Sequence, residues 1–188
     1  MKIALPVLLA ALLATPAPAQ VSSAYTRYTL PDDCTRIAAS DGEGDWADFV
    51  CPGFGGYPFV IRYGDGRESI TYGFATASGM STFAAFNYAN ETVEWRIIEN
   101  GETVRPFAAI QRWRLANSEG EWAHQMLVVS RVGQPSDGGA CPIAFVAPTD
   151  GANDRARDYA DRLADDFHCG TDMPVIEDLI SPFVGPPN

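Results

Sequence analysis

Lysine is almost absent from this chain. Lys2 is the only one among 188 residues, so every other basic side chain is an arginine. Positive charge is also scarce, since 24 Asp and Glu against 13 Lys and Arg give a formal net charge of −11. Such a chain repels nucleic acid and anionic lipid, and we expect neither as a partner. A cationic partner fits the charge, although acidity also simply keeps an exported protein soluble.

Long hydrophobic runs are missing as well. After the first 19 residues, no apolar run approaches the roughly 20 residues that a membrane helix needs. The shorter run 3–14 follows Lys2 and precedes Ala17-Pro18-Ala19, a small-x-small pattern that signal peptidases cut. We expect 1–19 to be a signal peptide cleaved after Ala19. The mature protein is then periplasmic or secreted, with no membrane insertion.

Residues 20–188 fit a single domain. Hydrophobic residues make up 46% of the chain and charged residues 20%, the balance of a folded soluble protein. No internal repeat or low-complexity linker divides the chain. We expect the small, polar segment 20–24 to be loosely ordered. We also expect a loose tail at 175–188, which ends in Gly-Pro-Pro-Asn and cannot extend a helix or a sheet.

Four cysteines allow three disulfide pairings, and chain geometry favours Cys34 with Cys51. The residues between them predict strands at 35–39 and 46–50. The Asp- and Gly-rich segment 41–44 suits the tight turn between these strands. The hairpin would bring Cys34 opposite Cys51, within disulfide reach.

The same argument pairs Cys141 with Cys169. A strand at 141–147 rises about 20 Å, and a helix at 153–168 returns about 24 Å. A zinc site built from these cysteines and His168 is the alternative. However, the chain has no C-x-x-C, and its Cys spacings match no common zinc pattern, so we expect no metal. Disulfides are typical of an oxidising compartment outside the cytosol.

Between the two cysteine pairs, the sequence is typical of β-strands joined by tight turns. Strands are expected at 59–63, 68–74, 92–98, 104–115 and 122–132. The turns between them are 64–67, 99–102 and 117–120. We predict an α+β fold, in which an antiparallel β-sheet is built from successive hairpins and one C-terminal amphipathic helix packs on it. A β-sandwich with an appended helix is the main alternative, and 75–91 stays unassigned.

The expected helix has one apolar face. Its members recur at helical spacing and are Ala156, Ala160, Leu163, Ala164 and Phe167. Asp150 or Asn153 can cap its first turn. Asp158 and Arg162 stand four residues apart, in the order that favours an ion pair. Asp165 and Asp166 lie near the negative end of the helix dipole, and the sequence offers no local reason for this pair.

The most unusual stretch is Cys51-Pro52-Gly53-Phe54-Gly55-Gly56-Tyr57-Pro58. Its glycines allow a close approach to a ligand, to which Phe54 and Tyr57 can present aromatic faces. The alternative, which we favour, is a structural loop with both rings tucked inward. With Arg67 at the end of a turn and His124 in a strand, these two aromatic residues make up our candidate ligand-binding set.

Four arginines fall within two neighbouring expected strands: Arg96, Arg105, Arg112 and Arg114. They can form an anion-binding face, because a guanidinium binds a carboxylate through two hydrogen bonds. The alternative that we favour is cross-strand pairing with Glu94 and similar neighbours.

Groups for catalysis are few. His124 and His168 are the only two histidines, and a Ser-His-Asp triad would have to use one of them. No G-x-S-x-G motif supplies the serine. The acidic stretch 41–48 fails the EF-hand pattern, because Trp46 and Pro52 stand where that loop requires Gly and Glu. We therefore expect no catalytic residue and no cofactor.

Three groups of residues carry a resemblance. C-P-G-F-G-G-Y-P at 51–58, G-D-G-R leading into S-I-T-Y-G at 64–73, and E-W-R at 94–96 resemble a set of small exported bacterial proteins of unknown function. The resemblance spans most of the mature chain. It implies a periplasmic or secreted location and assigns no activity and no functional residue.

These observations predict an exported, non-enzymatic binding domain for another macromolecule or a small ligand. One alternative is a periplasmic inhibitor of a cationic cell-wall hydrolase such as lysozyme, since negative charge would steer a basic enzyme inward. The other is a small hydrolase that uses His124 or a pair of carboxylates.

Overall fold

The computed structural model describes residues 19–75, 82–101 and 103–184. Its elements, in chain order, are β1 (Gln20–Arg27), β2 (Thr35–Ala39), β3 (Trp46–Cys51), β4 (Phe59–Gly64), β5 (Arg67–Tyr72), β6 (Asn87–Asn100), β7 (Thr103–Leu115), β8 (His124–Arg131), β9 (Cys141–Val146), α1 (Ala152–Leu163), β10 (Val175–Ile176) and the 3-10 helix η1 (Asp178–Phe183). None of the helices among these residues is both long and apolar enough to cross a bilayer.

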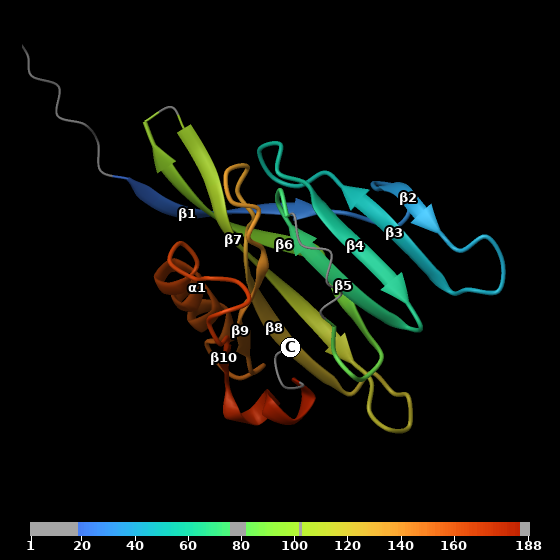
Figure 1. Ribbon diagram of the computed structural model, residues 1–188. Helices are drawn as coiled ribbons and strands as arrows, with labels where there is room; N and C mark the ends of the chain where they lie inside the picture. The colour runs from blue at the N-terminus through green and yellow to red at the C-terminus, as the bar shows by residue number, and fades with distance from the viewer. Residues whose placement is uncertain (1–18, 76–81, 102, 185–188) are drawn as a thin grey trace, which may run out of the picture.

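The elements form three layers (Figure 1). Sheet A has six strands in the order β1-β6-β7-β8-β9-β10, and sheet B has four in the order β2-β3-β4-β5. One face of sheet A packs on sheet B through residues such as Trp95 and Ala109. The other face packs on α1 through residues such as Ala108 and Ile110. Sheet A is therefore the middle layer.

The hairpin prediction is confirmed in part. Antiparallel neighbours in sequence form β2–β3, β3–β4, β4–β5, β6–β7, β7–β8 and β8–β9. The expected single antiparallel sheet is wrong, because β5 and β6 belong to different sheets and β10 joins β9 in parallel. The arrangement is nearer to our alternative of a β-sandwich with an appended helix. The continuous buried run 106–111 in β7 shows that both faces of this strand are covered. A strand with one solvent-exposed face would alternate between buried and exposed residues.

Both disulfides have the expected pairing. Cys34 and Cys51 lie with their Cα atoms 4.3 Å apart across the first hairpin. Cys141 and Cys169 lie 5.7 Å apart, which closes the strand and helix into one loop. Two structural disulfides fit a non-reducing, exported environment.

The described parts of both segments that we expected to be loose belong to the body, and residues 185–188 of the expected tail lie outside the described residues. The segment 20–24 belongs to β1, which pairs with β6 from Gln20 opposite Glu99 to Arg27 opposite Thr92. As an edge strand whose side chains are exposed or half-buried, β1 lacks the apolar alternation that would have revealed it. The segment 175–184 holds β10 and η1, and its Ile180 is only 3% exposed.

Helix α1 also differs from the prediction. It ends at Leu163 rather than at residue 168. Its N-cap is Gly151, in the left-handed conformation with φ 75°, and neither expected capping side chain, Asp150 or Asn153, makes a cap hydrogen bond. Small buried residues, Ala156 and Ala160, let the helix lie close to sheet A.

Candidate functional site

The aromatic residues of loop 51–58 support the core. Phe54 and Tyr57 are half-buried and pack on the cluster between the two sheets. The Tyr57 hydroxyl donates to Gln134 Oε1 at 2.9 Å. A Cβ on Gly53 would lie 2.2 Å from the Tyr57 carbonyl and 2.7 Å from the Trp95 ring, so the loop touches the core with its backbone. These contacts support the structural-loop alternative.

The other two candidates lie elsewhere. Arg67 holds a turn and its neighbouring segment, since its Nε donates to the Ala84 carbonyl at 3.0 Å and its guanidinium lies 5.1 Å from the Phe86 ring centroid. The ring of His124, the first residue of β8 in sheet A, packs against Phe183 of η1, at 4.3 Å between centroids. Over the part of the chain that the structure describes, no hydrogen bond, ion pair or ring interaction joins either side chain to loop 51–58. The four candidates therefore do not form one site.

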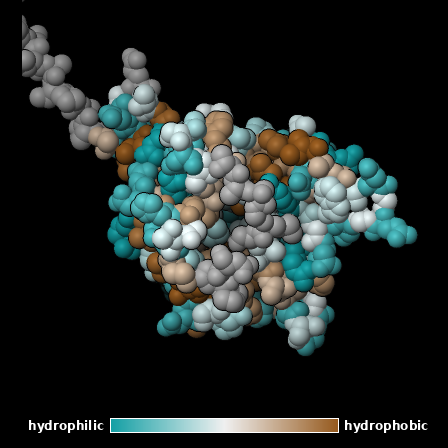
Figure 2. Space-filling view, in the orientation of Figure 1, coloured by the Kyte–Doolittle hydropathy of each residue, from teal (hydrophilic) through white to brown (hydrophobic). Residues whose placement is uncertain are grey.

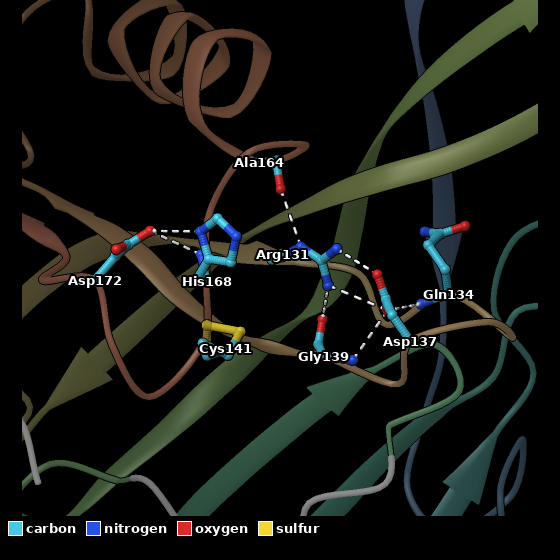
Figure 3. The surroundings of a disulfide bond; sticks show 9 residues. Arg131, Gln134, Asp137, Gly139, Cys141, Ala164, His168 and Asp172 are labelled. Carbon is cyan, nitrogen blue, oxygen red and sulfur yellow. Dashed lines mark hydrogen bonds and ion pairs between the residues drawn. A yellow bond between two sulfur atoms is a disulfide. The ribbon is translucent and has the colours of Figure 1, made fainter.

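Arg131 fastens the end of α1 to the loop before β9 (Figure 3). It donates to the Ala164 carbonyl at 3.1 Å, to the Gly139 carbonyl, and to Asp137 Oδ2 at 2.6 Å. Hydrogen bonds from Arg131 and from the Gly139 backbone lower the pKa of Asp137 to about 2. The cluster sits beside Cys141, so a disulfide and an arginine hold the same corner.

Two shallow hollows are lined by ion pairs. One, of about 430 Å³, lies between the pairs Arg105–Asp165 and Arg131–Asp137. The other, of about 400 Å³, holds Arg155, whose Nε donates to a Glu177 carboxylate oxygen at 2.8 Å and lowers the pKa of that carboxyl. In each hollow the arginines already bind carboxylates of the chain itself. We therefore assign the ion pairs that line both hollows a structural role.

Most of the arginines in the chain form ion pairs with its own carboxylates. The 13 Lys and Arg residues include one lysine, which leaves 12 arginines. Eight of them form ion pairs with Asp or Glu: Arg62, Arg67, Arg96, Arg105, Arg131, Arg155, Arg157 and Arg162. Among the described residues, the four without an ion pair are Arg27, Arg36, Arg112 and Arg114. The first two lie on separate edge strands, β1 and β2, whereas the last two are neighbours on β7.

The four arginines that we singled out from the sequence therefore divide into two pairs. Arg96 and Arg105 bind α1 and the turn after it, through Asp161 and Asp165. The cross-strand pairing that we favoured is wrong for this pair, because the partners come from the helix end of the chain. The contact also gives Asp165 the reason for its position that the sequence lacked.

Arg112 and Arg114 continue the face of β7 that α1 covers further along. Ala108 and Ile110 pack under the helix, and the next side chains on that face are the two arginines. Arg112 lies at the first turn of α1, where its Nη2 donates to Asn153 Oδ1 at 3.4 Å. Both arginines are half-buried.

Arg114 has a defined pair of cross-strand neighbours. It stands opposite Tyr88 of β6 and opposite Gln125 of β8, so all three side chains share one face of sheet A. The Tyr88 ring meets Trp122 edge to face, at 4.7 Å between centroids. Trp122 itself is 49% exposed. We call these residues, namely Arg112, Arg114, Tyr88, Gln125 and Trp122, the Arg112–Arg114 face.

Sequence reasoning named the two arginines of this face and missed its aromatic residues. Tyr88 falls in 75–91, which we left unassigned, although the structure places it in β6. We had expected Trp122 to belong to a strand, but it lies before β8. On the side of the molecule seen in Figure 2, hydrophobic surface forms several separate patches.

The described residues hold no group of three or more His, Cys, Asp and Glu side chains placed to bind a metal ion. His168, the second histidine, lies exposed with its Nδ1 3.4 Å from Asp172 Oδ2, in the turn after α1 (Figure 3). Comparisons of the chain with models of protein families, with curated proteins and with solved structures find no match, so the resemblance to small exported bacterial proteins stays a prediction.

Proposed function

We propose that the chain is an exported, non-enzymatic binding domain and that the Arg112–Arg114 face holds its ligand. The observation that carries this proposal is the pair of neighbouring arginines without a carboxylate partner, in an acidic chain where eight other arginines have one. A half-buried guanidinium loses hydration, and hydrogen bonds to an anion compensate for that loss. A bound anion gives both side chains the partner that the described part of the chain does not supply.

Export is part of the proposal. The two disulfides support it, since such bonds persist in oxidising compartments. We propose that cleavage after Ala19 releases the domain, and the first strand begins at the next residue, Gln20. The mass and N-terminal sequence of the protein recovered from the periplasm of a bacterial host test this point. An N-terminus other than Gln20 would contradict it.

The binding proposal is tested with the exported protein and two double variants. Arg112→Gln/Arg114→Gln removes the charge of the face. Arg27→Gln/Arg36→Gln removes the same charge from the other two arginines without an ion pair, and is the matched control. A panel of small organic acids, sugars and peptides is screened by thermal shift. We expect an acid that raises the melting temperature of the wild type and of the control, but not that of the face variant.

Two results would contradict the proposal. The first is a chemical change in any panel compound after incubation with the protein, which would make the chain an enzyme. The second is an equal response of all three proteins to every acid, which would place binding elsewhere.

A second candidate is an inhibitor of a cationic cell-wall hydrolase, and the net charge of −11 favours it. Electrostatic steering accelerates the encounter of oppositely charged proteins and weakens with salt. A lysozyme assay on bacterial cell walls, at low and at high salt, tests the idea. Unchanged lysozyme activity at a tenfold excess of the protein in low salt would exclude lysozyme as the target.

A further inference from the structure

The residues of the Arg112–Arg114 face indicate which class of anion it binds. Resting on the proposed function, we infer that the face binds a sugar that carries one carboxylate. The two arginines hold the carboxylate, and the sugar ring lies on Trp122. The inference follows from the spacing of the charges, the charge of the whole chain and the groups around the arginines.

The spacing of the arginines suits one compact anion. Residues two apart on a strand point to the same face with Cα atoms about 7 Å apart. Two long side chains at that distance can converge on a single carboxylate, so that each of its oxygens accepts from one guanidinium. Arg112 is already oriented by Asn153, with Nη2 3.4 Å from Oδ1. Arg114 lies on β7 between β6 and β8, and these neighbouring strands limit the directions that its side chain can take.

The charge of the chain limits how negative the ligand is. A net charge of −11 repels an approaching polyanion, and every further charge on the ligand adds to that repulsion. At physiological salt, interactions between exposed charges fade over about 8 Å, so a single negative group at the arginines is governed by its nearest neighbours. A carboxylate carries one charge, whereas a phosphate monoester carries about 1.5 to 2. The face therefore favours a monocarboxylate over a phosphate and over an acidic polymer.

The aromatic residues indicate a ring. The edge-to-face contact with Tyr88, at an interplanar angle of 86°, fixes the direction of Trp122 while 49% of that residue stays exposed. An exposed, oriented indole offers a flat surface on which a ring can stack. Tyr88 stands opposite Arg114, so this surface begins one strand away from the charge. A carboxylate on the arginines places an attached ring within reach of Trp122.

Neighbouring amides favour a ring with hydroxyl groups. Gln125 lies opposite Arg114 on β8, and Asn153 adjoins Arg112. Each amide has two donors and an acceptor, which match hydroxyl groups and have no counterpart on a plain aromatic ring. An amide that a ligand covers without offering it a hydrogen bond opposes binding, so a benzoate is a poorer fit than a sugar acid.

The test measures the binding of D-glucuronate to the exported protein by titration calorimetry. The comparison ligands are D-glucose, benzoate, inorganic phosphate and a galacturonate polymer. We expect D-glucuronate to bind at least tenfold more tightly than D-glucose, which lacks the carboxylate, and than benzoate, which lacks the hydroxyl groups. We expect phosphate and the polymer, counted per acidic group, to bind more weakly than D-glucuronate.

Variants assign the binding to the face. Arg114→Gln is expected to weaken D-glucuronate binding about 10- to 100-fold, the range for a hydrogen-bonded charge. Trp122→Ala is expected to weaken it several-fold, whereas Trp122→Phe retains a ring and most of the affinity. Arg27→Gln is expected to leave it unchanged. Circular dichroism confirms that each variant is folded, and the Phe variant separates stacking from any loss of packing.

The outcomes separate the ligand class from the proposed function. If benzoate, glucose, phosphate or the polymer binds as tightly as D-glucuronate, and Arg114→Gln abolishes that binding, the sugar-acid inference is wrong and the binding face stands. If no probe binds, or if Arg112→Gln/Arg114→Gln leaves every affinity unchanged, both are wrong.

Discussion

Two ion pairs between sheet A and the α1 region offer a controlled test of what holds the layers together. Arg96 binds Asp161 through two hydrogen bonds of 2.8 and 2.6 Å, and Arg105 binds Asp165 through two of 2.9 and 3.0 Å. The geometry is alike, but the burial is not. The side chains are 10% and 35% exposed in the first pair, against 35% and 57% in the second. The matched changes are Asp161→Ala and Asp165→Ala.

The expected losses follow from burial. Removing one partner of a buried ion pair costs about 3 to 5 kcal/mol, because the other charge is left without hydration or a partner. Asp161 is about one-third exposed, so water replaces part of its bonding, and we expect Asp161→Ala to lower the free energy of unfolding by about 2 to 3 kcal/mol. Exposed pairs contribute about 0 to 1 kcal/mol, which is the loss expected for Asp165→Ala.

The measurement is urea unfolding at pH 7 with both disulfides intact, followed by tryptophan fluorescence. A third variant, Arg96→Met/Asp161→Ala, removes both charges and is expected to recover part of the loss, since the cost arises from the orphaned guanidinium. Equal losses for Asp161→Ala and Asp165→Ala, or no recovery in the double variant, would refute this account of how burial sets the strength of the pairs.

Three further predictions concern the fastening of the fold. The pKa of Asp137 is about 2 in the folded protein against an ordinary 3.8, so its pair with Arg131 stabilises the fold above pH 4 and loses that contribution as the pH falls towards 2. Asp137→Asn should therefore be up to about 1 kcal/mol less stable at pH 6 and equal to the wild type near pH 2 in unfolding experiments; a constant difference would contradict this. Replacing Cys141 and Cys169 by serine opens a loop with a sequence separation of 28 and should cost about 3.6 kcal/mol in urea unfolding, whereas a loss below about 1 kcal/mol would show that the loop hardly restricts the unfolded chain. Gly53→Ala places a Cβ 2.2 Å from a carbonyl oxygen and should lower the melting temperature by several degrees, and an unchanged value would show that the loop yields freely.

Structural features that depend on residues close together in the chain were predictable from the sequence. The turn between β4 and β5 was expected because Asp and Gly accept positive φ, and Asp65 and Gly66 have φ of 52° and 67°. The pairing of Cys34 with Cys51 followed from the same kind of reasoning about the hairpin between them. In both cases the signal and the structure it determines lie within a few residues of each other.

Long-range partners were not predictable in this way. The negative charge of Asp165 is unfavourable near the C-terminal end of α1, where the helix dipole is negative. Only its contact with Arg105, 60 residues away, explains its position. Strand β1 was missed because an edge strand needs no apolar alternation. The division into two sheets depends on which strands meet, and turn residues do not encode that. For the candidate site, sequence reasoning found the two arginines but not the edge-to-face contact of Tyr88 with Trp122 beside them.

The position of the Arg112–Arg114 face follows from where β9 stops. Val146, the last residue of β9, pairs with Leu127, and Leu127 pairs with Arg112, so the strand ends level with Arg112. The chain turns over residues 147–151, and Gly151 in the left-handed conformation starts α1 at that level.

From there α1 runs back over β7, past Ile110 and Ala108, to the neighbourhood of Arg105. Among the arginines of β7, the one near the far end of the helix is therefore paired with a carboxylate, and the ones at and beyond the start of the helix are not. A helix that began one turn earlier would cover Arg114, which makes the length of the β9–α1 connection the feature that keeps the face open.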